Sequence, residues 1–336
     1  MKFCPECGKP RGTTQFCAEC GADLRAYAPD DAPAYEYDIE EALTPYEAVC
    51  NADGNSYTII SLKDTSLREL RIPTCVSAIH TGAFAGCDQI YSVTLPDSVT
   101  AVERRAFSGC TSLLSVALPK EIREINNEVF MGCSSFTTME LPDGVERIDG
   151  DAFHACSSLE RIRLPESLTY IGDNAFEDCS ALETIALPRA LTVLGIGAFL
   201  GCASLRSVSI PVGVTSLPRA VFGNCISLTD VTLTEGLVSV GAYAFAECAS
   251  LKAITLPASL TGIGEHAFSG CTALESITIP DGTVHIDEDA FSGCTALRSI
   301  TLPESIRTIG PRAFAGCTNL TTIHAPYRVK RMVKTK

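Results

Sequence analysis

The sequence of 336 residues contains no tryptophan, and aromatic residues make up only 7% of it. No uninterrupted apolar run approaches the roughly 18 residues of a membrane-spanning helix, so the chain is not expected to insert into a membrane. The sequence also has no excess of basic residues, and its formal net charge is −14 at pH 7. This charge disfavours nucleic acid or an anionic membrane surface as the main partner of the whole molecule.

Neither end shows a segment that would direct the chain out of the cell. The N-terminal MKFCPECGKPRG has no apolar core of the kind that a secretory signal needs. The C-terminal HAPYRVKRMVKTK has no hydrophobic anchor. These observations predict a cytoplasmic protein, and 17 cysteines agree with a reducing compartment in which thiols stay unpaired.

The motifs that mark common enzyme sites are also missing. The sequence has no P-loop, no glycine-rich dinucleotide motif, no HExxH and no Ser-His-Asp order. Acidic pairs occur in turns, such as Asp149 with Asp151, and such carboxylates could bind calcium. They do not recur on successive units, so capping of the turns explains them better. We therefore expect a protein that is not an enzyme.

What the sequence does contain is a repeat of 23 residues. Eleven cysteines from Cys87 to Cys317 follow one another at intervals of 23, and a phenylalanine precedes each by three residues. Proline keeps the same interval from Pro73 to Pro326, interrupted once at Thr234. A fixed period of this length predicts a solenoid of stacked units, each contacting mainly its neighbours.

One unit reads L-x-x-I-x-L-P-x-x-V-x-x-I-G-x-x-A-F-x-G-C-x-x. The alternation of Ile254 and Leu256 predicts a strand, which Pro257 ends. A second short extended stretch follows. A helical turn is expected next, because Gly, Asn or Asp follows that stretch in eight of eleven units and suits a helix N-cap. Glycine before the cysteine in seven units suits a left-handed exit.

The fold class is therefore a β-rich repeat solenoid with short helical turns and parallel strands about 4.8 Å apart. The A-F-x-x-C signature at this spacing resembles the BspA-like, or Treponema-type, leucine-rich repeats over roughly Leu67 to Pro326. The resemblance implies a curved, right-handed leucine-rich-repeat superhelix with a parallel sheet on its concave side. Many relatives of that type are secreted or surface proteins, and some are adhesins.

The repeated cysteine could be half a disulfide, a metal ligand, a nucleophile or a piece of core. Eleven is an odd number, and a whole ladder of bridges would strain every rung. A catalytic thiol would need a base nearby. The histidines do not recur at the interval of the cysteines, although His154 lies two residues before Cys156. We interpret each thiol as a small buried group whose weak S–H donor faces backbone carbonyls of the adjacent turn.

Four cysteines outside this period form a different pattern. Cys4 with Cys7 and Cys17 with Cys20 are two C-x-x-C pairs, each followed by glycine, and together they offer four thiolates to a tetrahedral metal site. The stretch resembles a bacterial zinc ribbon over about residues 3–24, which implies a structural zinc ion. Iron is the alternative for the metal, and a redox C-x-x-C pair is the alternative for the cysteines.

The sequence accordingly divides into five parts. These are a zinc ribbon at 1–24, an acidic flexible linker at 25–50, an N-terminal cap at 51–66, leucine-rich repeats at 67–326 and a basic tail at 327–336. Within the cap, residues 58–62 are expected to form a strand that covers the apolar end of the solenoid. The tail is expected to be frayed and solvated, with contact to nucleic acid or an acidic surface as the alternative.

A binding face is expected on the outward positions of the strands. This face is largely Ser and Thr, whereas protein interfaces favour Tyr and Arg. The candidate contacts are Tyr91, Arg161, Arg163 and Arg206. Arg161 and Arg163, flanked by glutamates, form the main candidate patch, and solvated charges on a strand face are the alternative interpretation.

Together these features predict a non-catalytic scaffold that binds a protein ligand through its repeat surface and carries a structural zinc ribbon. A cell-surface or secreted adhesin is the alternative that the resemblance suggests. Association of the ribbon and the basic tail with nucleic acid is a second alternative. No feature specifies the ligand or an oligomeric state.

Overall fold

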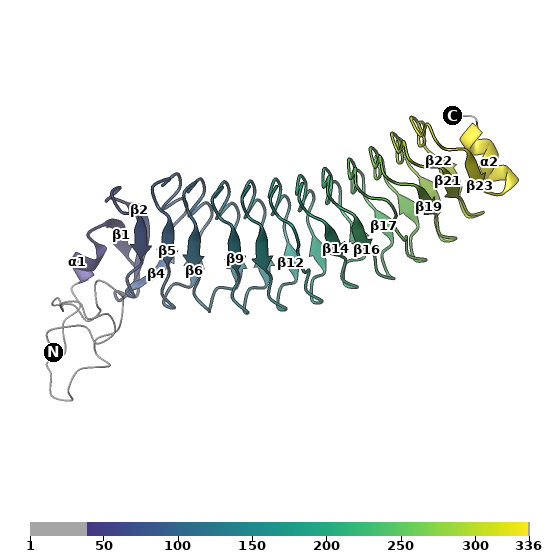
Figure 1. Cartoon of the computed structure of the whole chain (residues 1–336). Coiled ribbons are helices and arrows are strands. Elements are labelled where there is room, and N and C mark those ends of the chain that lie inside the picture. Colours follow the sequence, from purple (N-terminus) through teal and green to yellow (C-terminus); the bar gives the residue numbers. More distant parts are fainter. Residues whose placement is uncertain (1–38, 335–336) are drawn as a thin grey trace.

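The computed structural model describes residues 39–334, which form an elongated β-solenoid of about 12 turns (Figure 1). The coils follow one another along a single, gently curved row, with the ends of the described chain at opposite ends of the row (Figure 1). Within this part of the chain no helix is long and apolar enough to cross a bilayer. The row of stacked coils confirms the solenoid that the 23-residue repeat predicts.

Most coils contribute a short strand to a first parallel ladder. In β11 (Arg161–Arg163) the middle residue is buried and its two neighbours are exposed, because alternate side chains of a strand point to opposite faces. Paired residues are 23 positions apart, so that Ile162 lies opposite Met139. The other strands of this ladder are β3 (Glu69–Arg71), β5 (Ser92–Thr94), β7 (Ser115–Ala117), β9 (Thr138–Glu140), β14 (Ser207–Ser209), β16 (Asp230–Thr232), β19 (Ser276–Thr278), β21 (Ser299–Thr301) and β23 (Thr322–His324).

A second parallel ladder runs beside the first, made by the short extended stretch after each proline. Its register is the same, with Ile148 opposite Ile171. Its strands are β4 (Val76–Ile79), β6 (Ala101–Val102), β8 (Glu124–Ile125), β10 (Arg147–Ile148), β12 (Tyr170–Ile171), β13 (Val193–Leu194), β15 (Ser216–Leu217), β17 (Ser239–Val240), β18 (Gly262–Ile263), β20 (His285–Ile286) and β22 (Thr308–Ile309).

Within the described residues the first ladder is interrupted between β7 and β9 and again at the coil of Ile254. Residues 251–257 form no strand, although Ile254 and Leu256 are each only 7% exposed. Thr184, in an earlier coil, makes only isolated bridges to its two neighbours. The alternation therefore predicted burial correctly at Ile254, whereas the hydrogen bonds of a strand are not formed there.

The third side of each coil is a series of tight turns. The predicted helical turn was wrong, because within residues 39–334 the only helices lie at the two ends. The predicted left-handed exit is confirmed, since all eleven residues before the repeated cysteines have positive φ, including Ala155 at 57° and Glu247 at 60°. A second left-handed position stands four residues earlier in every turn, as at Arg105 with φ 58°.

Backbone hydrogen bonds between coils explain why this side is not helical. The amide of Phe176 donates to the carbonyl of Ala198 in the next coil at 2.8 Å, and the repeated phenylalanines from Phe84 to Phe291 all make this bond. The position that was interpreted as a helix N-cap instead allows the backbones of neighbouring coils to approach each other closely. A Cβ added to Gly195 would lie 2.2 Å from the carbonyl carbon of the glycine one coil earlier.

The core is a stack of identical side chains. Neighbouring rings of the repeated phenylalanines, Phe84 to Phe314, lie 5.2–5.8 Å apart between centroids and are nearly parallel. The repeated cysteines from Cys110 to Cys294 are buried beside them. The same residue at the same place in each coil thus buries the same surface on both of its neighbours.

The N-terminal cap is larger than predicted. β2 (Tyr57–Leu62) pairs with β4 in parallel, which confirms the capping strand, but it also pairs antiparallel with β1 (Tyr46–Cys50). A short helix, α1 (Ile39–Leu43), precedes that hairpin. Tyr46 is 4% exposed and packs edge-on against Phe84, 6.3 Å between centroids. Residues 39–50, assigned to the flexible linker, therefore belong to the cap, because they cover the first coil.

The C-terminal tail is also a cap. The prediction of a frayed terminus was wrong, because α2 (Tyr327–Lys334) packs on the last coil with Val329 fully buried. Met332 and Val333 lie on the same face and also contact the core. The Arg328 guanidinium donates hydrogen bonds to two carbonyl oxygens of the preceding coil, at 2.6 and 2.7 Å. The spacing of the apolar residues in this basic segment therefore determines that it forms a helix packed on the last coil.

Candidate functional site

The predicted binding face lies on the first ladder, and the structure divides its four candidate residues among three places. Arg161 and Arg163 are neighbours on β11, both exposed, with Ile162 buried between them. Tyr91 directly precedes β5, three coils earlier, and Arg206 directly precedes β14, two coils later. At about 4.8 Å per coil, these two side chains start about 14 and 10 Å from the arginine pair.

Three of the four candidates have acidic partners. The Tyr91 hydroxyl donates to Glu69 at 2.5 Å, and this hydrogen bond raises the pKa of the tyrosine. The guanidinium of Arg163 donates to Asp143 at 2.8 Å. That of Arg206 lies 3.8 Å from a carboxylate oxygen of Glu183 in the preceding coil. These pairs agree with the interpretation of the face as solvated charges.

Arg161 differs from the other three. Its side chain makes no ion pair with any residue between 39 and 334, and it is exposed. Its register partner on β9 is Thr138, whereas Arg163 lies opposite Glu140. Among the three candidate arginines, Arg161 is therefore the one without an ion pair to another described residue.

The repeated thiols have a structural role. Each Sγ from Cys110 to Cys317 donates to the carbonyl oxygen of the phenylalanine 26 residues earlier, at 3.1–3.3 Å. Burial raises the pKa of Cys110 to about 12, so this thiol stays protonated at neutral pH. Each of the eleven repeated cysteines, all in the described part of the chain, is a free thiol. The interpretation as core groups that face backbone carbonyls is confirmed.

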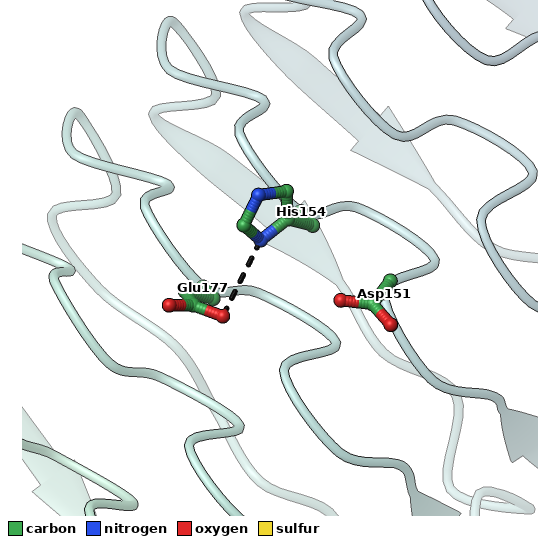
Figure 2. A group of neighbouring side chains, drawn as sticks. All are labelled: Asp151, His154 and Glu177. Atoms are coloured by element: carbon green, nitrogen blue, oxygen red, sulfur yellow. Dashed lines mark ion pairs between the residues drawn. The ribbon is translucent and has the colours of Figure 1, made fainter.

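A second group of polar side chains lies on the turn side of the solenoid. Asp151, His154 and Glu177 come from two successive coils and point toward one another (Figure 2). Nδ1 of His154 lies 3.4 Å from Oε2 of Glu177, and one ligating atom from each residue lies within 4.8 Å of the others. Burial raises the pKa of Glu177, although His154 opposes this shift. We call these three residues the turn cluster.

Other buried carboxylates on the turn side are neutralised by arginine. Glu128 receives hydrogen bonds from Arg104 and Arg105, and these outweigh its burial and hold its pKa below the ordinary value. Asp289 pairs with Arg312. Within residues 39–334 the carboxylates of the turn cluster have no such partner among the ion pairs with arginine or lysine.

Sequence analysis did not identify the turn cluster, although the sequence holds a signal for it. His154 and Glu177 are 23 residues apart, so the period places them at the same position of successive coils. Asp151 precedes His154 by three residues in the same turn. The four cysteines of the expected zinc ribbon, Cys4, Cys7, Cys17 and Cys20, lie outside the described residues.

Comparison with protein families finds one that covers most of the chain. The model described as "BspA type Leucine rich repeat region (6 copies)" matches residues 60–149, 123–248 and 215–335. Comparison with curated proteins finds no significant match.

Solved bacterial structures share the fold. A leucine-rich cell surface protein from Faecalibacterium prausnitzii A2-165 is 28% identical, with a TM-score of 0.52, over 92% of this chain and 99% of that one. The pneumococcal vaccine antigen PcpA is 19% identical, with a TM-score of 0.57, over 86% of this chain and 94% of that one. A leucine-rich repeat protein from Eubacterium ventriosum ATCC 27560 is 21% identical, with a TM-score of 0.51, over 83% and 94%.

Proposed function

The chain belongs to the BspA-type leucine-rich repeat family, and we propose that it is a non-catalytic scaffold that binds a protein ligand on the first ladder. The observation that carries the proposal is the exposed strand face around β11, where Arg161 stands without an acidic partner. Arginine is enriched at the energetic centres of protein interfaces because its planar guanidinium binds carboxylates with two hydrogen bonds.

The rest of the face supports this use. Around Arg161, the strands β9, β11 and β14 each expose polar side chains on this face. Arg163 and Arg206 each form an ion pair on the exposed surface. Such exposed pairs contribute about 0–1 kcal/mol each, so a partner carboxylate can replace them at little cost. An acidic protein segment therefore fits this face.

Charge reversal at one position tests the binding face. The full chain, immobilised, is exposed to native lysate and to intact cells from its source, and captured proteins are identified. Arg161→Glu is expected to reduce capture of the specific ligand at least tenfold. Arg307→Glu, an exposed arginine beside the second ladder, is the matched control and is expected to bind like the wild type. Equal capture by both variants would exclude this face.

The N-terminal cysteines belong to the proposal as a structural zinc site. Cys4, Cys7, Cys17 and Cys20 supply four thiolates at the spacing of a zinc ribbon, and a segment of this size gains its folding energy from the metal. Metal analysis is expected to find one zinc that the double variant Cys4→Ser/Cys7→Ser loses, while the repeats keep their melting temperature. Retention of this zinc in the variant would exclude the ribbon.

A cell-surface adhesin is the second candidate, and one specific observation favours it. The protein from Faecalibacterium prausnitzii, 28% identical over nearly its whole length, is described as a cell surface protein. The cysteine-rich composition instead predicts a cytoplasmic location. Labelling of intact cells with a membrane-impermeant amine reagent distinguishes them, since only a surface protein is modified before lysis.

Association with nucleic acid is the weaker alternative, because the basic C-terminal segment forms α2 and packs on the last coil. Arg328 is engaged with carbonyls of the preceding coil, and Val329 is buried on the packed face of the helix. Retention on heparin that is lost on removal of residues 1–24 would nevertheless assign such a role to the ribbon.

A further inference from the structure

We propose that the turn cluster of Asp151, His154 and Glu177 binds one divalent transition-metal ion, such as Zn²⁺, between two successive coils (Figure 2). The three side chains offer one imidazole nitrogen and two carboxylate groups. This site uses none of the ribbon cysteines and none of the residues proposed for the binding face.

The backbone holds the two contributing turns in place. The amide of Asp151 donates to the carbonyl of Asp173 in the next coil at 2.9 Å, and that of Ala155 donates to the carbonyl of Glu177 at 2.8 Å. These two bonds fasten the turns on both sides of His154. The repeat period therefore brings His154 and Glu177 together at 3.4 Å, and the ligand atoms of all three residues lie within 4.8 Å of one another.

The imidazole presents an unused ligand atom to this space. Nδ1 of His154 is buried and forms no hydrogen bond with any described residue, even though it faces Oε2 of Glu177 at 3.4 Å. Buried polar atoms almost always have a partner, because desolvation without one is costly. A cation bound between this nitrogen and the carboxylates would supply the missing partner.

Charge gives an independent reason. The turn side buries carboxylates elsewhere, at Glu128 and Asp289, and there arginines neutralise them. Within the described chain the only ion pair of Glu177 is with His154, and Asp151 has none. Two partly buried acids with one imidazole attract a dication, which neutralises both.

The donor set indicates the class of ion. Ca²⁺ and Mg²⁺ prefer oxygen ligands alone, whereas imidazole together with carboxylate suits Zn²⁺ and neighbouring transition metals. Metal–ligand bonds of about 2.1 Å place adjacent donors about 3.0–3.4 Å apart, which the distance from His154 to Glu177 already matches. The side chains of His154 and Glu177 are 30% and 22% exposed, so water can reach the remaining positions.

Zinc binding by the full chain tests the proposal. Protein is dialysed against a series of Zn²⁺ concentrations, and bound zinc per chain is measured for the wild type, His154→Ala and Glu177→Gln. The wild type is expected to bind one equivalent more than either variant at a Zn²⁺ concentration that saturates it, with affinity reduced at least tenfold in each variant. The ribbon is unchanged in all three, so the difference reports the turn cluster.

His285→Ala provides the control, because His285 is exposed on β20, away from the cluster. It is expected to bind zinc like the wild type. Circular dichroism verifies that each variant is folded. If His154→Ala does not fold, the comparison of the wild type with Glu177→Gln tests the assignment. Equal zinc binding by the wild type and a folded His154→Ala or Glu177→Gln variant, at all concentrations, would overturn the proposal. Saturation of the turn cluster by Ca²⁺ with the same affinity would overturn the assignment to a transition metal.

Discussion

The thiol of Cys202 donates a hydrogen bond to the backbone carbonyl of Phe176, one coil earlier, over 3.2 Å. Cys202 is fully buried, and burial raises its pKa well above the ordinary value. The same relationship recurs along the solenoid, so each thiol ties its coil to the preceding one. A small, weakly polar side chain suits this place because it both fills the core and donates to a carbonyl.

Replacing Cys202 with alanine is therefore expected to cost stability without changing the fold. Loss of the buried sulfur and of its hydrogen bond should lower the free energy of unfolding by about 1–2 kcal/mol. Urea denaturation followed by circular dichroism measures the change. Cys50→Ala, at an exposed cysteine, is the control and should be neutral. A Cys202→Ala variant as stable as the wild type would show that the thiol is dispensable.

The left-handed positions give a second prediction. Ala220 has φ 55°, a conformation that costs an L-residue about 1–2 kcal/mol and glycine almost nothing. Ala220→Gly is expected to stabilise the protein by about 0.5 kcal/mol, because the greater freedom of glycine in the unfolded chain offsets part of the gain. The reverse change, Gly109→Ala at φ 74°, is expected to destabilise it. Melting temperatures that move in the opposite directions would contradict the argument.

These turns show which part of the fold could be predicted from sequence. The period places Phe176 and Cys202 in the core, because a stacked repeat buries the same position in each coil. The left-handed column that contains Ala220 could not be predicted, because its residue type varies from coil to coil. Its geometry is imposed by hydrogen bonds to the next turn, and these depend on the stack as a whole.

The ends were harder to predict than the repeats. Tyr46 stands among acidic residues and prolines, and its strand forms only by pairing with β2, which local composition does not reveal. Val329 is one apolar residue in a basic segment, and only the open end of the last coil gives it a partner. The turn cluster is harder to predict, because a repeat pattern indicates what the coils share, whereas His154 and Glu177 each occur only once at their position of the repeat.

The pH dependence of stability provides a third prediction. Glu128 is 7% exposed, and Arg104 and Arg105 hold its pKa below the ordinary value despite burial. Its contribution is therefore full above the unfolded-state pKa, about 4.3, and is lost as the pH falls through the lower folded-state value. Glu128→Gln is expected to cost about 1–2 kcal/mol at pH 7 and progressively less below pH 4.

Denaturation at pH 7 and at about pH 3.5 measures this difference. Glu124→Gln, on the exposed side of β8, serves as the control and should have little effect at either pH. If Glu128→Gln were equally destabilising at both, the ion pairs with the two arginines would not be the source of its contribution.

The C-terminal cap yields the last prediction. Val329 is fully buried, and without α2 the apolar end of the last coil, including Phe314, would be open to solvent or to another chain. Val329→Asp is expected to detach α2, since burying an unpaired carboxylate costs several kcal/mol. Hydrogen exchange should then show lost protection across α2 and β23, and light scattering should show association through the uncovered end. Tyr327→Asp is the control, because that side chain is 79% exposed in the same helix. If both variants kept full protection, α2 would not be the cap.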